Sequence, residues 1–144
     1  MIISRKVKDE NELFEIKKIL EEKGINDKFD NNQIVYILIE NSKIIGVSKV
    51  TRHNNIGILN YVFVTKSKRG ENLGDGLMRA LFNHCLLNGI FNIYYSGVND
   101  YLLKKGFKKM DKVNLNEDIK QILSKSQILS LNLNDFFSSG CCHS

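Results

Sequence analysis

The sequence has few of the features that mark membrane and secreted proteins. No apolar run approaches the roughly 20 residues that a membrane-spanning helix needs. The first six residues lack the charged-then-apolar order of a signal peptide. Cysteine occurs three times, an odd number that excludes a disulfide framework, and Cys141 and Cys142 are adjacent, a poor geometry for pairing with each other. We therefore expect a cytoplasmic protein with no membrane partner.

Length and composition fit one soluble domain. The 144 residues are too few for two comfortable domains, and 42% hydrophobic with 26% charged residues is ordinary for a chain that builds a core. Proline and tryptophan are absent, which tells us little about function. We expect a single domain over residues 1–137 and a loose C-terminal tail over 138–144. The formal net charge of +5 suits an anionic ligand, but it does not separate a phosphorylated cofactor from nucleic acid.

The predicted strands and helices follow the order of a mixed α/β fold. Asp9 followed by Glu12 resembles a capping box and predicts a helix that starts there and stops near Gly24. β-Branched runs separated by short polar turns predict an antiparallel meander. In all, the patterns predict strands at 2–7, 34–40, 43–52, 56–64, 91–96, 107–113 and 128–133, and helices at 9–24, 73–89, 99–105 and 117–124. Residues 25–33 are expected to form a loop or a short second helix.

A basic, glycine-containing turn joins the fourth predicted strand to the long helix. Such a turn directs unpaired backbone N–H groups and the positive end of the helix dipole at one point. Gly70 and Gly74 allow a ligand to approach closely, and Asn72 is one of the few non-glycine residues that tolerate a left-handed conformation. Three cations surround the turn: Lys66, Lys68 and Arg69. These features indicate a pyrophosphate or polyphosphate site, the alternative being an ordinary strand–helix turn.

Two familiar phosphate loops are excluded. The turn has no Gly-Lys-Ser/Thr sequence, so it is not the loop of the nucleotide hydrolases. A dinucleotide-binding fold has its glycines after the first strand, with an acidic residue about 20 positions later, whereas this turn follows the fourth.

The same segment resembles motif A of the GCN5-related N-acetyltransferase (GNAT) superfamily. Five positions match that motif: Val64, Arg69, Gly70, Gly74 and Leu77. Lys66 replaces the family's frequent proline, and Asn72 replaces its middle glycine. Outside the motif, residues 43–47 (Lys-Ile-Ile-Gly-Val) and 104–107 (Lys-Lys-Gly-Phe) are similar to two further family patterns. The resemblance spans roughly residues 2–113.

The resemblance implies a fold and a cofactor. The fold is a central, mostly antiparallel sheet that splays between the fourth and fifth strands and is flanked by helices. The cofactor is acetyl-CoA, whose pantetheine arm is expected on the backbone of the fourth strand, chiefly at Phe63 and Val64. Its pyrophosphate is expected on the backbone N–H groups of Arg69, Gly70, Glu71, Asn72, Leu73 and Gly74. Asn99 matches a position that often contacts the cofactor's arm.

The catalytic acid is less clear from the resemblance. Amine acylation needs a base for the ammonium proton and an acid that returns a proton to the departing thiolate. The family's usual tyrosine falls at Leu102 here, while Tyr101 lies one residue earlier. Either a shift of helix register brings Tyr101 into place, or the protein has no tyrosine acid. One of Tyr94 and Tyr95, on the fifth strand, is expected to face the cofactor cleft.

No general base can be assigned. Asn60 does not titrate, His53 lies at a turn and Glu40 ends a strand, so each also fits a solvated surface position. The tail residues Cys141, Cys142 and His143 can hold a metal only if other segments complete the shell, and no Cys-x-x-Cys pair exists, so we predict no metal site.

The leading hypothesis is an N-acetyltransferase in which an amine attacks the thioester of acetyl-CoA directly. The acceptor, a small molecule or a protein amine, is not identified, although Asp27 and Asp30 are a weak sign of a cationic one. The alternative is a non-catalytic coenzyme A-binding regulator that docks on a partner, favoured by Leu102 at the usual acid position. A nucleic-acid-binding module is a third reading, but the lysines are scattered and no aromatic–basic platform occurs.

Overall fold

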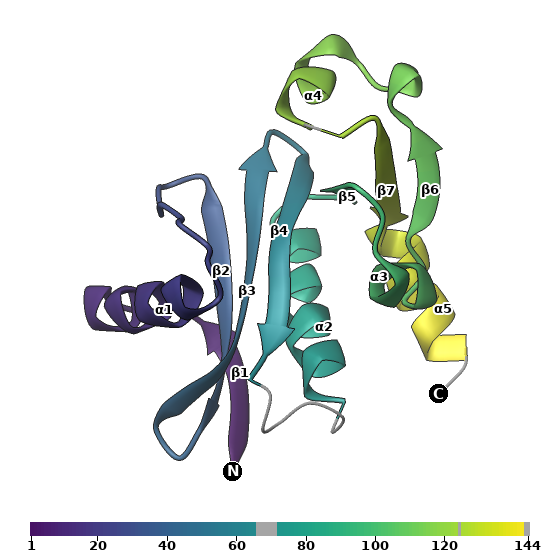
Figure 1. The fold of residues 1–144 in the computed structure, drawn as a ribbon. Coiled ribbons are helices and arrows are strands. Elements are labelled where there is room, and N and C mark those ends of the chain that lie inside the picture. The colour runs from purple at the N-terminus through teal and green to yellow at the C-terminus, as the bar shows by residue number, and fades with distance from the viewer. Residues whose placement is uncertain (66–71, 124, 143–144) are drawn as a thin grey trace. The chain divides into compact units, whose positions relative to one another are not determined.

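The computed structural model describes residues 1–65, 72–123 and 125–142 (Figure 1). Its elements are β1 (Ile2–Lys6), α1 (Glu10–Glu22), β2 (Gln33–Glu40), β3 (Lys43–His53), β4 (Ile56–Val64), α2 (Leu73–Leu87), β5 (Asn92–Ser96), α3 (Asp100–Lys104), β6 (Lys108–Asp111), the 3-10 helix η2 (Lys112–Asn114), α4 (Glu117–Ile122), β7 (Gln127–Asn132) and α5 (Leu133–Cys142). The predicted order of strands and helices is confirmed. Two elements were not predicted, η2 and α5.

The strands form a mixed sheet in the order β1-β2-β3-β4-β5-β7-β6. The pairs β1–β2, β2–β3, β5–β7 and β6–β7 are antiparallel, and β2–β3 has an irregularity at Leu38/Ile39. The β4–β5 pair is parallel and joins only Ile56–Ile58 to Asn92–Tyr94. The ladder therefore ends at Ile58, although β4 continues to Val64. The mixed, mostly antiparallel α/β fold is confirmed.

Backbone contacts divide the chain into two compact units. The first unit comprises Met1–Thr51 and Asn60–His84, and in it β2 and β3 bury side chains on both faces. One face packs against α1, through Ile16, Leu20, Val35, Ile37, Ile44 and Val47. The other packs against α2, through Leu38, Ile45, Val64 and Leu77. Because successive side chains of a strand point to opposite faces, Ile37 and Leu38 belong to different clusters.

The second unit comprises Arg52–Leu59 and Cys85–Ser144, with its own apolar cluster. That cluster contains Ile56, Ile58, Leu115, Leu123 and Ile128, with Tyr94, Met110 and Ile119 packed against it. The prediction of one domain over residues 1–137 stays a prediction.

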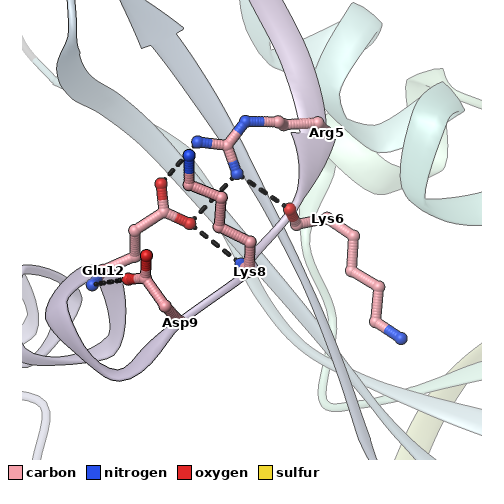
Figure 2. A network of polar contacts seen from close by, with 5 residues as sticks. All are labelled: Arg5, Lys6, Lys8, Asp9 and Glu12. Carbon is pink, nitrogen blue, oxygen red and sulfur yellow. Dashed lines mark hydrogen bonds and ion pairs between the residues drawn. The ribbon is translucent and has the colours of Figure 1, made fainter.

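The start of α1 confirms Asp9 as its N-cap and modifies the predicted capping box. The Glu12 backbone N–H donates to Asp9 Oδ1 at 2.9 Å. The Glu12 carboxylate accepts from the backbone N–H of Lys8 at 2.9 Å, one residue before the position used in the standard motif. Arg5 on β1 donates to both carboxylate oxygens of Glu12, as Figure 2 shows. This hydrogen bonding lowers the pKa of Glu12 and ties the helix start to the edge strand.

Three boundary predictions are corrected. Residues 25–32 form neither a helix nor a strand, so the loop alternative is the right one. The strand predicted at 107–113 ends at Asp111, whose carboxylate accepts from the backbone N–H of Val113 and so begins η2. Part of the segment expected to be a loose tail, 138–142, is helical, because α5 continues to Cys142. Asn132 starts that helix, since its Oδ1 accepts from the backbone N–H of Asp135 at 3.0 Å.

Candidate functional site

The predicted pyrophosphate turn is described only at its helical end. Arg69, Gly70 and Glu71 lie outside the described residues. Asn72 has φ +59°, so it adopts the left-handed conformation that this residue type tolerates. Leu73 begins α2, a helix of 15 residues, and Gly74 lies in its first turn. The chain thus enters a long helix directly from a left-handed residue. As in any α-helix, the backbone N–H groups of the first turn have no intrahelical partner.

The fourth strand brings Phe63 and Val64 to the two faces of the first unit. Phe63 packs against the α1-side cluster, and Val64 is buried in the α2-side cluster. On this strand the carbonyl oxygen of Phe63 lies 3.2 Å from where a Cβ on Gly46 would stand. Gly46, part of the motif at residues 43–47, therefore lets β3 and β4 approach closely beside the predicted arm-binding residues.

Asn99, Tyr101 and Leu102 belong to the short helix α3 and its cap. The Asn99 Oδ1 accepts from the Leu102 backbone N–H at 3.1 Å and caps the helix. The amide nitrogen of Asn99 is therefore the group that could donate a hydrogen bond to a ligand. Leu102 is 1% exposed and is a core residue, whereas Tyr101 is 39% exposed. The ammonium of Lys105 lies 5.5 Å from the Tyr101 ring centroid. The role of Tyr101 as acid stays a prediction.

The two tyrosines of β5 differ in environment. Tyr94 packs against the apolar cluster of the second unit, and burial raises the pKa of its hydroxyl. Tyr95 is opposite Leu129 of β7 and, by strand alternation, points to the other face of the sheet. Tyr94 therefore contributes to core packing. Of the two tyrosines, Tyr95 is the one that stays a candidate for contact with the cofactor.

The three candidate bases are not brought together by the described contacts. Asn60 Oδ1 accepts from the hydroxyl of Thr51 at 2.7 Å. Glu40 ends β2, where it is opposite Ile2 of β1 and Lys43 of β3. His53 ends β3 beside the turn at Asn54, which has φ +58°. A general base stays unassigned.

Sequence reasoning missed a partly buried charged cluster, which we call the Asp27 anchor: Asp27, Lys49 and Tyr61. The Lys49 side chain is 2% exposed, and its ammonium lies 2.5 Å from Asp27 Oδ2. The Tyr61 hydroxyl donates to the same oxygen at 2.8 Å. The ammonium also lies 5.5 Å from the ring centroid of Phe29 and 5.6 Å from that of Tyr61. A lysine within the buried stretch at residues 44–50 of a central strand was the available signal.

The electrostatics of the anchor keep Asp27 ionised. Burial raises the pKa of this carboxyl, but hydrogen bonds from Lys49 and Tyr61 lower it more, so the net pKa lies below its ordinary value. Burial, and then the hydrogen bond to Asp27, raise the pKa of the Tyr61 hydroxyl far above its ordinary value. Asp27 thus has an internal cation as partner, which removes it as a sign of a cationic acceptor. Asp30 is exposed and accepts from the Asn32 backbone N–H.

Other reactive groups are buried or lie outside the description. Burial raises the pKa of the Cys85 thiol to about 12, which keeps it protonated and unreactive. The side chains of Cys141 and Cys142 and all of His143 lie outside the described residues. Within the described part of the chain, no group of three or more His, Cys, Asp or Glu side chains could hold a metal. None of the described helices is long and apolar enough to span a membrane.

Comparison with known proteins gives one family match and many structural matches. The family model "Acetyltransferase (GNAT) domain" matches residues 4–120. No curated protein matches the sequence significantly. A GNAT acetyltransferase structure from Staphylococcus aureus is 18% identical, with 92% of this chain and 99% of that one covered and a TM-score of 0.68. The Escherichia coli ribosomal-protein-S18-alanine N-acetyltransferase is 12% identical, with 92% and 94% covered and a TM-score of 0.68.

A larger enzyme is also similar. N-acetylglutamate synthase from Neisseria gonorrhoeae, solved with coenzyme A and N-acetyl-glutamate, is 16% identical with a TM-score of 0.72. The match covers 92% of this chain and 35% of that one, so the present chain spans about a third of that enzyme's length. At these identities the structures show the fold alone. The family match covers most of the sequence, from residue 4 to residue 120, and the chain therefore belongs to the family of GNAT acetyltransferase domains.

Proposed function

We propose that the protein transfers the acetyl group of acetyl-CoA to an amine by direct attack of the amine on the thioester. The observation that carries this proposal is the family match over residues 4–120 together with the left-handed Asn72 at the start of α2. Two similar structures, both of the gonococcal synthase, contain coenzyme A, which supports this cofactor. A cytoplasmic location stays part of the proposal.

The pyrophosphate would bind at the start of α2. The backbone N–H groups of Leu73 and Gly74 are in the first helical turn, where they have no intrahelical acceptor. The helix dipole adds partial positive charge at the same end, and anions bind there readily. Arg69, Gly70 and Glu71 complete the proposed site. The pantetheine arm would bind the backbone of β4 near Phe63 and Val64, beyond the point where the β4–β5 ladder ends.

The chemistry requires two proton movements and no covalent enzyme intermediate. A base or a water chain takes a proton from the ammonium, and the neutral amine attacks the thioester carbonyl. The C–S bond then breaks as the amide forms, and the thiolate of coenzyme A takes a proton from an acid or from water. Tyr101 is the proposed acid, and its 39% exposure is compatible with proton exchange with solvent.

A second candidate is a non-catalytic protein that binds coenzyme A and docks on a partner. The observation that favours it is Leu102, because the usual acid position holds a side chain that is 1% exposed and packed in the core. The two candidates share the cofactor site and differ in turnover.

Titration calorimetry with acetyl-CoA tests the shared site. We expect micromolar binding by the natural sequence and its loss in Gly74→Trp, whose indole would occupy the proposed pyrophosphate position. Gly76→Trp is the matched control, because residue 76 lies about 200° further around the helix and is exposed, with no atom within 4 Å of where an added Cβ would stand. Absence of binding by the natural sequence to both acetyl-CoA and coenzyme A would overturn the proposal.

A thiol-release assay then separates the candidates. The amine panel contains an amino acid, a polyamine and a peptide with an N-terminal alanine. Release of coenzyme A that requires an amine supports the transferase, and loss of that release in Tyr101→Phe supports the assigned acid. Tight binding of acetyl-CoA without turnover of any amine favours the regulator.

A further inference from the structure

Residues 25–30, which form neither a helix nor a strand, show alternating burial. Ile25, Asp27 and Phe29 are half-buried, whereas the residues between them and Asp30 are exposed. Ile25 and Phe29 pack against the apolar cluster on the α1 side. Asp27 therefore occupies the central inward position between two apolar side chains, where its partner is the buried ammonium of Lys49.

Stability alone does not explain why the Asp27 anchor contains two charges, because removing charges from water costs free energy. Desolvation of a buried ion pair can exceed its Coulombic gain, and apolar residues of similar volume often stabilise as well or better. A buried pair can instead select one arrangement among several. In this segment a shift by one residue would bring Lys28 toward Lys49 and leave Asp27 outside. Because that shift opposes two cations and exposes Ile25 and Phe29, the pair selects a single register.

The anchor includes a residue of β4, the strand whose backbone is the proposed binding site of the pantetheine arm. Tyr61 donates to Asp27 from β4, and its ring centroid lies 5.9 Å from that of Phe63. Lys23, which caps the C-terminal end of α1, places its ammonium 4.8 Å from the Phe63 ring centroid. The residue two positions before the segment and the centre of the segment are thereby linked to Phe63 and Tyr61 on the same face of β4.

We propose that Asp27 is a positioning residue of the transferase, which holds residues 25–30 in one register over β3 and β4. The segment then forms a fixed wall that the acceptor amine meets beside the cofactor arm. This inference rests on the proposed function. Asp27 acts through Lys49 and Tyr61 and takes no part in proton transfer.

Hydrogen exchange tests the register directly and needs no substrate. In Asp27→Asn, amide exchange over residues 25–30 should accelerate by about tenfold or more, because one local restraint is removed. The matched control Asp30→Asn makes the same change at an exposed position of the segment, and exchange should stay within about twofold. Unchanged exchange in Asp27→Asn would overturn the inference.

Kinetics with an amine from the panel test the role in transfer. Asp27→Asn should lower kcat/KM for the amine by about tenfold or more, since small misplacements at a reacting pair are expensive, while the Kd of coenzyme A changes by less than about threefold. Tyr61→Phe should give a smaller loss of the same kind. An equal loss in Asp30→Asn would contradict the proposed position.

The double variant Asp27→Asn/Lys49→Met separates positioning from stability. It removes both charges, so it should recover most of the stability lost in Asp27→Asn and stay folded. We expect rapid exchange over residues 25–30 and low kcat/KM to persist in it. If slow exchange and normal kcat/KM returned together with stability, the inference would be overturned. If the natural sequence turns over no amine, the role in transfer fails with the proposed function, while the exchange result still decides the register.

Discussion

The two faces of the sheet in the first unit are built on different principles. The α2-side cluster of Leu38, Ile45, Val64 and Leu77 is apolar, and its partly buried neighbours are Tyr36, Val62 and Leu73. The α1-side cluster is equally buried at Ile37 and Val47, yet the same face holds the Asp27 anchor. The first face depends on volume and shape and on uncharged hydrogen bonds of Tyr36 with His84 and Ser48, whereas the second also depends on the match of one cation to one carboxylate.

This difference indicates where the fold is tolerant and where it is specific. An apolar cluster accepts exchanges of similar volume at modest cost, since dispersion and burial are not directional. A buried charge has no such tolerance, because its desolvation is offset only by the correct partner. The face that carries the charge is also the one whose covering segment, residues 25–32, has no helix or strand of its own.

The largest effect is expected for Lys49→Met. This change leaves Asp27 partly buried without its cation and should lower the free energy of unfolding by about 4 kcal/mol at neutral pH. In the natural sequence the pKa of Asp27 lies below its ordinary value of 3.8. The ionised carboxylate therefore contributes fully to stability above that pH, and this contribution is lost as the pH falls through the lowered pKa of the folded protein. The difference between the two proteins should therefore narrow in acid.

Urea unfolding of the natural sequence and of Lys49→Met, at neutral pH and at about pH 2.5, measures this difference in the free energy of unfolding. The control is Lys43→Met on the same strand, where the side chain is exposed and the change should stay within about 0.5 kcal/mol. A difference that is the same at both pH values would show that Lys49 contributes through packing alone.

A smaller, pH-independent effect is expected for Leu77→Ala on the apolar face. Leu77 is fully buried, so its loss should cost about 3 kcal/mol from transfer and cavity terms. Leu87→Ala in the same helix is the control, since that side chain is 77% exposed. The loss in free energy of unfolding should be equal at neutral and acidic pH. A loss that changes with pH would contradict the proposed difference between the two faces.

The smallest effect is expected for Gly46→Ala, which tests overpacking on the same apolar face. The added methyl group would lie 3.1 Å from Leu38 Cβ, 3.2 Å from the Phe63 carbonyl oxygen and 3.3 Å from Leu77 Cδ2. Two of these atoms are close to the backbone and cannot move easily, so we expect a loss of about 2 kcal/mol by thermal or urea unfolding. Gly76→Ala, which meets nothing within 4 Å, should be neutral or stabilising. No loss in Gly46→Ala would mean that the strands separate freely there.

Local patterns predicted much of the fold and one part of the site. The N-cap at Asp9, the stop at Gly24 and the left-handed Asn72 depend on near neighbours in the chain, and all three are found in the structure. The end of the chain was less predictable, because α5 begins at Leu133, directly after its cap Asn132, and continues through residues whose composition resembles a loose tail.

The sequence by itself determined the order of strands and helices, the likeness to the GNAT family and the tolerance of Asn72 for a left-handed conformation, because these depend on periodicity and local backbone preference. Only the tertiary structure decided that Leu102 is core, that Tyr94 packs inward, and that Asp27 meets Lys49 and Tyr61. Asp27 and Tyr61 are 34 positions apart. Pairing across such a separation is set by how strands and loops stack, which no local pattern encodes.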